Sequence, residues 1–474
     1  MNTFVDAINR PAGIGHNNLA RTENGMRAVA TTGSAIVDLF YAAGASRGKD
    51  LSVQFHSAYK EDRVRALRLL AWVRDVRGGA GEREVARKLL QTIELNYPHE
   101  LEQLIPLIPF YGRWDDLLVF KTDEGRALAF DAIIKALQAG NGLCAKWMPR
   151  KGDDAIMLRR HMGLTPKQYR RLLVGLTKVV EQQMCAKNWS EIEYSHVSSV
   201  AAQRYQKAFA KHDKERYNQY RQDLQKPALV KAGEVKINVG AVYPYDIIKT
   251  FNQNRDALTA QAAWDALPNY VGKASILPIV DTSGSMHSSI DRNLRVVDVA
   301  ASLGMYLASK NRGVFQDVFM TFNTDPKFIQ MKGTFAQKLE QVYRATWGGS
   351  TDLHKSMDLI LATAVKGNVP ATDMPEFLLI LSDMQFNFCA RYDDRAIDMI
   401  ARKFNDAGYE MPKVVFWNLR DAPGNKPVTV GENGVALVSG FSPAIVKSVL
   451  KADKFTPLDV VLATLDGARY NAIV

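Results

Sequence analysis

Two aspartates and several small hydroxyl residues gather in three segments of the second half of the chain. The apolar run ILPIV leads into Asp281-Thr-Ser283-Gly-Ser285, where alternation along an extended loop can aim three side chains at one point. WGGSTDL places Thr351 after two glycines, and EFLLILS ends at Asp383. Carboxylates, hydroxyls and waters are the ligands that a hard cation such as Mg²⁺ prefers. The pattern predicts a site for Mg²⁺, or for another divalent cation such as Mn²⁺, on Asp281, Ser283, Ser285, Thr351 and Asp383.

The order of these segments resembles the metal-ion-dependent adhesion site of von Willebrand factor A domains. The resemblance implies that the serines and the threonine contact the metal directly or through water, and that the aspartates hold it partly through water. It also implies one open coordination position for an acidic group of a partner. Two points stay open: Ser350 could replace Thr351 as the ligand, and Asp352 could be a helix N-terminal carboxylate instead.

The elements around this site alternate in type. Apolar runs of strand length, rich in Val, Ile and Phe, are followed by amphipathic helical stretches, which predicts a mostly parallel sheet covered on both faces. FMTFNTDPKFIQM adds one hairpin and thus one antiparallel edge strand. We therefore expect a doubly wound, Rossmann-like α/β domain of the von Willebrand factor A type over residues 271–474, with its ligands beyond the carboxyl ends of the strands.

The first half of the chain is helical in pattern. RVRALRLLAWVRDV (63–76) repeats apolar residues every three or four positions, and further helical stretches follow between short breaks that contain Gly or Pro. Helix pairs stacked in this way form an α-solenoid. We expect a loose, flexible lead-in over residues 1–34, α-helical, HEAT-like repeats forming a ring or crescent over 35–242, and a connector over 243–270.

The net charge of +11 belongs almost entirely to that helical half. Residues 1–270 contain 39 Lys or Arg and 29 Asp or Glu, whereas residues 271–474 contain 22 and 21. Such asymmetry indicates a polyanionic partner for the first half, although surplus surface lysine would give the same count. Two segments, 146–187 and 204–231, concentrate the basic residues, and the second also contains Tyr205, Phe209, Tyr217 and Tyr220, which either stack on bases or form core.

A second resemblance is based on four sequence segments: WVRDVRGGAGERE (72–84), IPFYGRWDDLL (108–118), CAKWMPRK (144–151) and KAFAKHDKERYNQY (207–220). They resemble a largely uncharacterised plant and viral family that joins a helical region to a von Willebrand A domain. That layout is similar to the Ro autoantigen family, whose TROVE module is a ring of helical repeats that binds small noncoding and misfolded RNAs. The resemblance implies an RNA-binding surface, which we assign to Lys146, Arg150, Lys151, Arg159, Arg160, Lys167, Arg170, Arg171, Arg204, Lys207 and Lys211.

Other chemistry finds little support in the sequence. RGGAGERE follows a helix and lacks the Lys-Ser/Thr of a phosphate-binding loop. The paired Asp115 and Asp116 could be acids or metal ligands, but helix-terminal carboxylates need no such role. No Ser-His-Asp or Cys-His catalytic set can be identified in the sequence, so we do not expect an enzyme. Three scattered cysteines, the absence of a long apolar run and of a signal-like N-terminus indicate a cytoplasmic protein.

The function expected from these features is that of a Ro-like ribonucleoprotein: a scaffold or quality-control protein for small structured or misfolded RNA, in a bacterial or viral (phage) setting. The alternative is a metal-dependent protein–protein adaptor, or a component of virus-particle assembly, whose metal site grips an acidic group of a partner protein and whose basic face has no RNA role.

Overall fold

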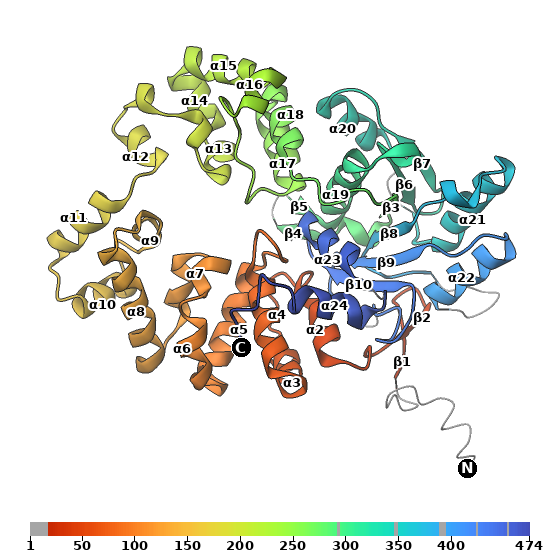
Figure 1. The fold of residues 1–474 in the computed structure, drawn as a ribbon, viewed down its shortest axis with the longest axis horizontal. Coiled ribbons are helices and arrows are strands. Elements are labelled where there is room, and N and C mark those ends of the chain that lie inside the picture. The colour runs from red at the N-terminus through yellow and green to blue at the C-terminus, as the bar shows by residue number, and fades with distance from the viewer. Residues whose placement is uncertain (1–17, 292–293, 346–348, 388–394, 423–424, 453–454) are drawn as a thin grey trace.

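The computed structural model describes residues 18–474 except 292–293, 346–348, 388–394, 423–424 and 453–454, so the GIGHNN part of the predicted lead-in lies almost wholly outside the described residues. Figure 1 shows two parts, a long arc of helices and an α/β domain on which the arc begins and ends. The fold class expected from the sequence, a helical module followed by an α/β domain, is confirmed at this level.

The arc opens with four well-packed helices: α2 (Ala35–Ala43), α3 (Ser52–Glu61), α4 (Arg63–Arg74) and α5 (Arg83–Asn96). Side chains at two of the N-termini satisfy backbone donors, because Ser34 accepts from the amide of Val37 and Asp62 from that of Arg65. Trp72 and Phe40 stack with ring centroids 4.1 Å apart and are fully buried.

The next part of the arc consists of helices of different lengths that share the same core. They are η1 (Pro98–Glu100), α6 (Leu101–Leu104), α7 (Ile108–Tyr111), η2 (Trp114–Val119), α8 (Asp123–Gln138), α9 (Gly142–Trp147), α10 (Asp153–His161) and α11 (Pro166–Leu176).

A second, smaller core begins after α11. Val180, Ile192, Tyr194, Val197, Ala201, Phe209 and Tyr217 form a cluster separate from the main core. The elements of this region are α12 (Val180–Cys185), η3 (Trp189–Glu191), η4 (Tyr194–His196), α13 (Ser199–Arg204), α14 (Gln206–His212), α15 (Lys214–Asp223) and α16 (Pro227–Ala232). The predicted connector then contains two helices, α17 (Pro244–Asn254) and α18 (Ala257–Ala266).

The α/β domain is built on a six-stranded sheet in the order β10-β9-β8-β3-β6-β7. Its strands are β3 (Ile276–Asp281), β6 (Val318–Phe322), β7 (Lys327–Gln330), β8 (Phe377–Ser382), β9 (Lys413–Asn418) and β10 (Val435–Ser439). All neighbours pair in parallel except β6 and β7, so the predicted antiparallel edge strand is confirmed. The central strands β3 and β8 are buried along their whole length, as a sheet covered on both faces requires.

Helices flank this sheet, and shorter elements connect them. The helices are α19 (Val296–Lys310), α20 (Phe335–Arg344), α21 (Leu353–Lys366), α22 (Ala396–Asp406), α23 (Val446–Lys451) and α24 (Pro457–Leu465). The remaining elements are η5 (Gly284–His287), β4 (Ser289–Asp291), β5 (Leu294–Arg295), η6 (Gly313–Phe315), η7 (Ala371–Asp373) and η8 (Pro443–Ile445). Within the described ranges, no helix has both the length and the apolar character needed to cross a membrane.

Both ends of the arc pack against the α/β domain. At the first end, the amide of Gly44 donates to Oγ of Ser439 at 3.0 Å, and a Cβ on Gly44 would lie 2.3 Å from the Ser439 carbonyl oxygen. At the other end, Phe335 of α20 contacts the rings of Phe251 and Trp264. The α/β domain therefore joins the two ends of the arc (Figure 1).

The segments near the two ends of the described residues also pack against other parts of the molecule. The segment after α24 returns to α4, where Arg469 pairs with Asp75 and the hydroxyl of Tyr111 donates to the Arg469 carbonyl at 2.9 Å. At the other terminus, β1 (Leu19–Arg21) and β2 (Arg27–Val29) form an antiparallel hairpin. The sequence analysis placed no regular structure there, yet this hairpin packs on the α/β domain.

Candidate functional site

The three predicted metal-site segments meet at the carboxyl edge of the sheet. Strands β3 and β8 are parallel neighbours, with Val280 opposite Leu381, so Asp281 and Asp383 come from adjacent strand ends. Both carboxylates are fully buried, with 0% of each residue exposed. Adjacent parallel strands bring their carboxyl ends to one edge, which is why residues about a hundred positions apart share one site.

Hydrogen bonds hold the first loop in a curled path. The amide of Ser283 donates to Oδ1 of Asp281 at 2.9 Å, and Ser382 donates its hydroxyl to the other carboxylate oxygen of Asp281. The hydroxyl oxygens of Ser283 and Ser285 lie 3.2 Å apart. Three hydroxyl or carboxylate ligands predicted from the sequence, at Asp281, Ser283 and Ser285, are therefore together.

The second loop closes on the first through its glycines. The amide of Gly284 donates to the carbonyl of Gly349 at 3.1 Å. Gly349 has φ +93°, and a Cβ there would lie 2.6 Å from Oγ1 of Thr324, so only glycine fits without displacing Thr324. Thr351 is buried at this loop.

The structure describes the residues at the two open points of this loop. Ser350 is exposed, and its hydroxyl accepts from the side-chain amide of Asn387 at 3.0 Å, so it has a partner of its own. Asp352 caps α21, because its carboxylate accepts from the amide of Lys355 at 3.1 Å. Thr351 is thus the buried hydroxyl residue of the loop.

The two aspartates raise the cost of each other's ionisation. Burial, together with the charge of Asp383, raises the pKa of Asp281 well above its usual value, and burial also raises the pKa of Asp383. The guanidinium of Arg420 lies close by, with Nη1 3.6 Å from Oδ2 of Asp383, and that oxygen is buried without a hydrogen-bond partner. A cation bound at such a buried carboxylate pair would offset the repulsion between the two charges and the cost of burying them.

The donor set fits a hard divalent ion better than a soft one. Within the described ranges no cluster of three or more His, Cys, Asp or Glu side chains surrounds a common point. Two carboxylates and neighbouring hydroxyls remain, all of them oxygen donors, and such a set leaves several positions to water, as Mg²⁺ prefers. Ser382, which hydrogen-bonds Asp281, was missed from the sequence because it stands in the apolar strand run immediately before Asp383.

The predicted RNA-binding residues lie on α9 to α14 and in the turns between them. Lys146 and Arg159 are half-buried, whereas the other nine are exposed. Lys146 approaches Glu181 at 3.7 Å, and Arg150 donates to the carbonyls of Lys146 and Met148. Among the described residues, no acidic side chain pairs with the members of a group that we call the open basic set: Arg160, Lys167, Arg170, Arg171, Arg204, Lys207 and Lys211.

The aromatic residues of the same region belong to the core. Phe209 and Tyr217 are buried, and Tyr205 and Tyr220 pack against the second core cluster. Tyr194 contacts the rings of Phe209, Tyr217 and Tyr220. The stacking of these rings on bases, one of two readings of the sequence, is therefore wrong for Phe209 and Tyr217, whose helical spacing reflects packing.

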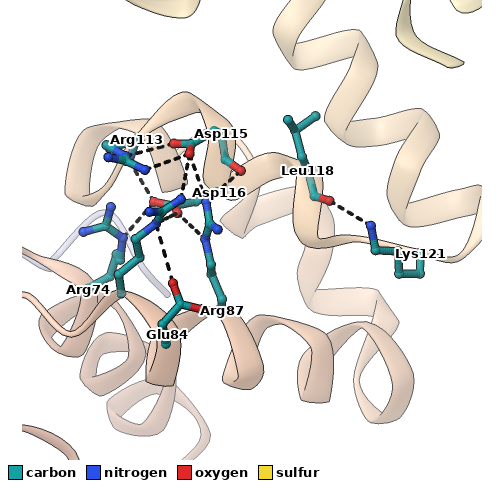
Figure 2. A network of polar contacts seen from close by, with 9 residues as sticks. Arg74, Glu84, Arg87, Arg113, Asp115, Asp116, Leu118 and Lys121 are labelled. Atoms are coloured by element: carbon teal, nitrogen blue, oxygen red, sulfur yellow. Dashed lines mark hydrogen bonds and ion pairs between the residues drawn. The ribbon is translucent and has the colours of Figure 1, made fainter. Parts of the chain in front are cut away.

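Asp115 and Asp116 are structural, because they form ion pairs with arginines. Figure 2 shows three of these arginines, Arg74, Arg87 and Arg113. Asp116 is fully buried and accepts from Nε of Arg74 at 2.7 Å and from Nε of Arg87 at 2.8 Å. Asp115 accepts from Nη2 of Arg83 and of Arg113, each at 2.8 Å. Burial opposes the ionisation of Asp116, but the arginines outweigh it and hold its pKa below the usual value. The network ties the RGGAGERE turn to the YGRWDD segment.

Two sequence families match this chain, and both are described as domains of unknown function. DUF2828 matches residues 130–270 and DUF7788 matches residues 275–465, so the boundary between them falls between α18 and β3. An uncharacterised protein of Acanthamoeba polyphaga mimivirus is 28% identical over 519 aligned residues, which cover 96% of this chain and 89% of that protein. The crystal structure of the Ro protein of Deinococcus radiodurans, 14% identical with a TM-score of 0.48, covers 92% of this chain and 100% of that one.

Proposed function

We propose that this protein is a non-catalytic, Ro-like RNA-binding scaffold, which binds small structured or misfolded RNA on the helical arc and a divalent cation in an α/β domain of the von Willebrand factor A type. The observation that supports RNA binding most directly is the open basic set, seven exposed cations on or beside α10 to α14 without an acidic partner among the described residues.

Pairing distinguishes the open basic set from other cations nearby. Arg216 pairs with Asp213 at 2.9 Å and Arg221 pairs with Asp256 at 3.0 Å, so the charges of these arginines are largely neutralised within the protein. An exposed cation without such a partner keeps its full charge for a phosphate and releases a condensed counterion when it binds one. Because this interaction reads charge and not base identity, it fits a scaffold for many RNAs.

The cation would be held by Asp281, Ser283, Ser285, Thr351 and Asp383, the oxygen-bearing residues that the three loops bring to one edge of the sheet. Bound there, Mg²⁺ or Mn²⁺ would supply a Lewis-acidic position for an acidic group or a phosphate of a partner. The fit is supported by the buried, hydrogen-bond-free Oδ2 of Asp383 and by the close approach of the two glycine-containing loops.

Filter binding with a small structured RNA tests the RNA proposal. One variant replaces Arg160, Lys167, Arg170 and Arg171 by Gln. A matched control makes the same change at Arg312, Lys332, Arg344 and Lys366, four exposed cations of the α/β domain. We expect the first variant to lose most of the binding and the control to keep it. Undetectable or salt-insensitive binding by the unaltered protein, or equal losses in both variants, would reject the proposal.

The adaptor alternative predicts another pattern. If Asp281→Ala abolishes the binding of a protein partner, while the unaltered protein shows no RNA binding, the metal site serves protein assembly instead. RNA that copurifies with the protein, seen as an absorbance ratio at 260 and 280 nm that falls after nuclease treatment, would favour the scaffold.

A further inference from the structure

A cavity of about 690 Å³ lies at the joint between the end of the arc and the α/β domain. One wall comes from α17, and the other comes from η5, β5, α19 and α20. Helices α17 and α19 pack against each other at this joint (Figure 1). Pockets of this volume take small organic ligands and occur preferentially between domains. The described residues that line the cavity include none of the proposed metal ligands and none of the open basic set.

The apolar part of the lining is aliphatic and buried. Six of its side chains belong to residues that are at most 9% exposed: Ile248, Leu294, Val297, Ala301, Leu339 and Val342. The rings of Tyr245 and Tyr343 also line the cavity. Such a surface favours the flat, weakly polar body of a ligand, because the burial of apolar area supplies most of the binding free energy.

The polar part of the lining is rich in hydrogen-bond donors. Nη1 of Arg295 donates to Nδ1 of His287 at 3.3 Å. Because a guanidinium has no acceptor, the hydrogen of this neutral ring is on Nε2, which can donate to a ligand. Lys249 adds an ammonium group from α17. Nδ2 of Asn252 donates to the hydroxyl oxygen of Tyr343 at 2.6 Å, so that hydroxyl keeps its own hydrogen for another acceptor.

The charges of the lining favour one anionic group. Its charged side chains are Lys249, Arg295 and Asp298, which leaves an excess of one positive charge when His287 is neutral. Asp298 accepts from Nε of Arg295 at 3.1 Å and from Nη2 at 2.8 Å, so the carboxylate occupies one side of the guanidinium. A single phosphate ester matches this balance, and its oxygens accept from guanidinium, imidazole and ammonium donors. A chain of several phosphates would bring more negative charge than the lining offsets.

We propose that this cavity binds a nucleoside monophosphate, whose base and ribose lie on the aliphatic lining and whose phosphate is bound by Arg295, His287 and Lys249. The side-chain amides of Asn252 and Gln253 supply polar groups for the edge of the base. Inorganic phosphate, or a nucleoside without phosphate, uses only one part of the lining. Because the walls belong to the end of the arc and to the α/β domain, the bound nucleotide stabilises the joint between them.

Calorimetric titration of the full chain with AMP, GMP, CMP and UMP tests this inference, with inorganic phosphate and the four nucleosides as the separate parts. We expect at least one nucleotide to bind about tenfold more tightly than its nucleoside or inorganic phosphate and to raise the midpoint temperature of unfolding. Arg295→Gln should weaken nucleotide binding about tenfold or more, because it removes a charged hydrogen-bond donor, and should leave the affinity for the nucleoside unchanged.

Arg395→Gln is the matched control for Arg295→Gln. Each arginine directly precedes a helix of the α/β domain and pairs at 2.8 Å with an aspartate three positions further on. Arg395 is not among the residues that line the cavity, so its replacement should leave the nucleotide affinity unchanged. Ala301→Leu tests the apolar half of the proposal: the added bulk should abolish nucleotide binding without unfolding the protein.

Three results would overturn the inference. The first is the absence of binding by all four nucleotides. The second is an affinity for inorganic phosphate equal to that for the nucleotides, which would show an anion site that does not recognise a nucleoside. The third is an equal loss in Arg295→Gln and Arg395→Gln, which would reflect only the lost ion pair at a helix start. If Ala301→Leu does not fold, the two arginine variants decide.

Discussion

Replacing Asp116 by Asn should be among the most destabilising single changes of charge in the helical arc. The carboxylate is fully buried and contacts Arg74 and Arg87 at 2.7 and 2.8 Å, Arg83 at 3.7 Å, and the amide of Arg113 at 2.9 Å. The side chain of Arg74 is only 9% exposed, so the substitution leaves a buried guanidinium without its counter-charge. Breaking a buried pair from one side costs about 3–5 kcal/mol, and Asn preserves the shape, so charge dominates this cost.

Asp466→Asn is the control for this substitution. Asp466 also pairs with two arginines, Arg65 at 2.9 Å and Arg68 at 2.8 Å, but its side chain is 37% exposed. Water already screens that interaction, so its loss should cost about 1 kcal/mol or less. Urea unfolding at pH 7, followed by tryptophan fluorescence and by circular dichroism, measures both; Trp147, which stacks under Arg113 at 3.8 Å, reports on the network itself.

The pH dependence supplies a second check on the same substitution. The pKa of Asp116 is lowered in the folded protein, so the unfolded chain binds a proton more readily. The ionised carboxylate therefore contributes stability that is complete above pH 3.8, its ordinary pKa. This contribution is lost as the pH falls through the pKa of the folded state. The difference between Asp116→Asn and the unaltered protein should therefore shrink below about pH 4. A cost at pH 7 no larger than that of Asp466→Asn would refute the reasoning.

Three further predictions concern other parts of the molecule. Gly349→Ala should destabilise the metal loop by about 1–3 kcal/mol and weaken Mn²⁺ binding in calorimetry, whereas Gly408→Ala, with φ +76° and open space around it, should affect stability alone. In salt titrations of RNA binding, Gln at Arg160, Lys167, Arg170 and Arg171 should reduce the slope of log K against log salt by about 3, and an unchanged slope would show that these side chains meet no phosphates. Burial raises the pKa of Glu82 to about 7, although Arg47 lies 3.0 Å away. The folded state therefore binds a proton more readily than the unfolded chain, and stability falls as the pH rises from about 4.5 to 7. In thermal unfolding, the midpoint temperature of Glu82→Gln should match that of the unaltered protein near pH 4 and exceed it at about pH 8.

Local patterns in the sequence were sufficient for the α/β domain. Apolar runs such as EFLLILS and the Asn323–Pro326 turn predicted buried parallel strands and one antiparallel edge, because strand burial and turn chemistry are properties of a few adjacent residues. The residues of the metal loops could also be predicted from local sequence, because they come directly after the apolar runs that form β3 and β8. Their meeting at one edge then requires only that these two strands lie side by side.

Other features depend on contacts between residues far apart in the chain, which one-dimensional patterns do not encode. Phe209 and Tyr217 could be surface or core until a second core cluster placed them inside. Asp115 and Asp116 gained their arginines from α4 and α5, about thirty to forty residues away. The hairpin at residues 19–29 is too short to be stable alone and forms against the α/β domain, so no local signal could have revealed it.

The amino-acid sequence by itself determined the two kinds of domain, the oxygen-rich character of the metal loops and the concentration of positive charge in the helical half, because composition and periodicity are written in consecutive residues. Only the tertiary structure decided that both ends of the arc attach to the α/β domain, since closure depends on the summed curvature of many helix contacts. It likewise decided that the turn at residues 22–25 docks on the segment just after Asp383, about 360 residues further along the chain, because hydrogen bonds and a β-bridge join the two.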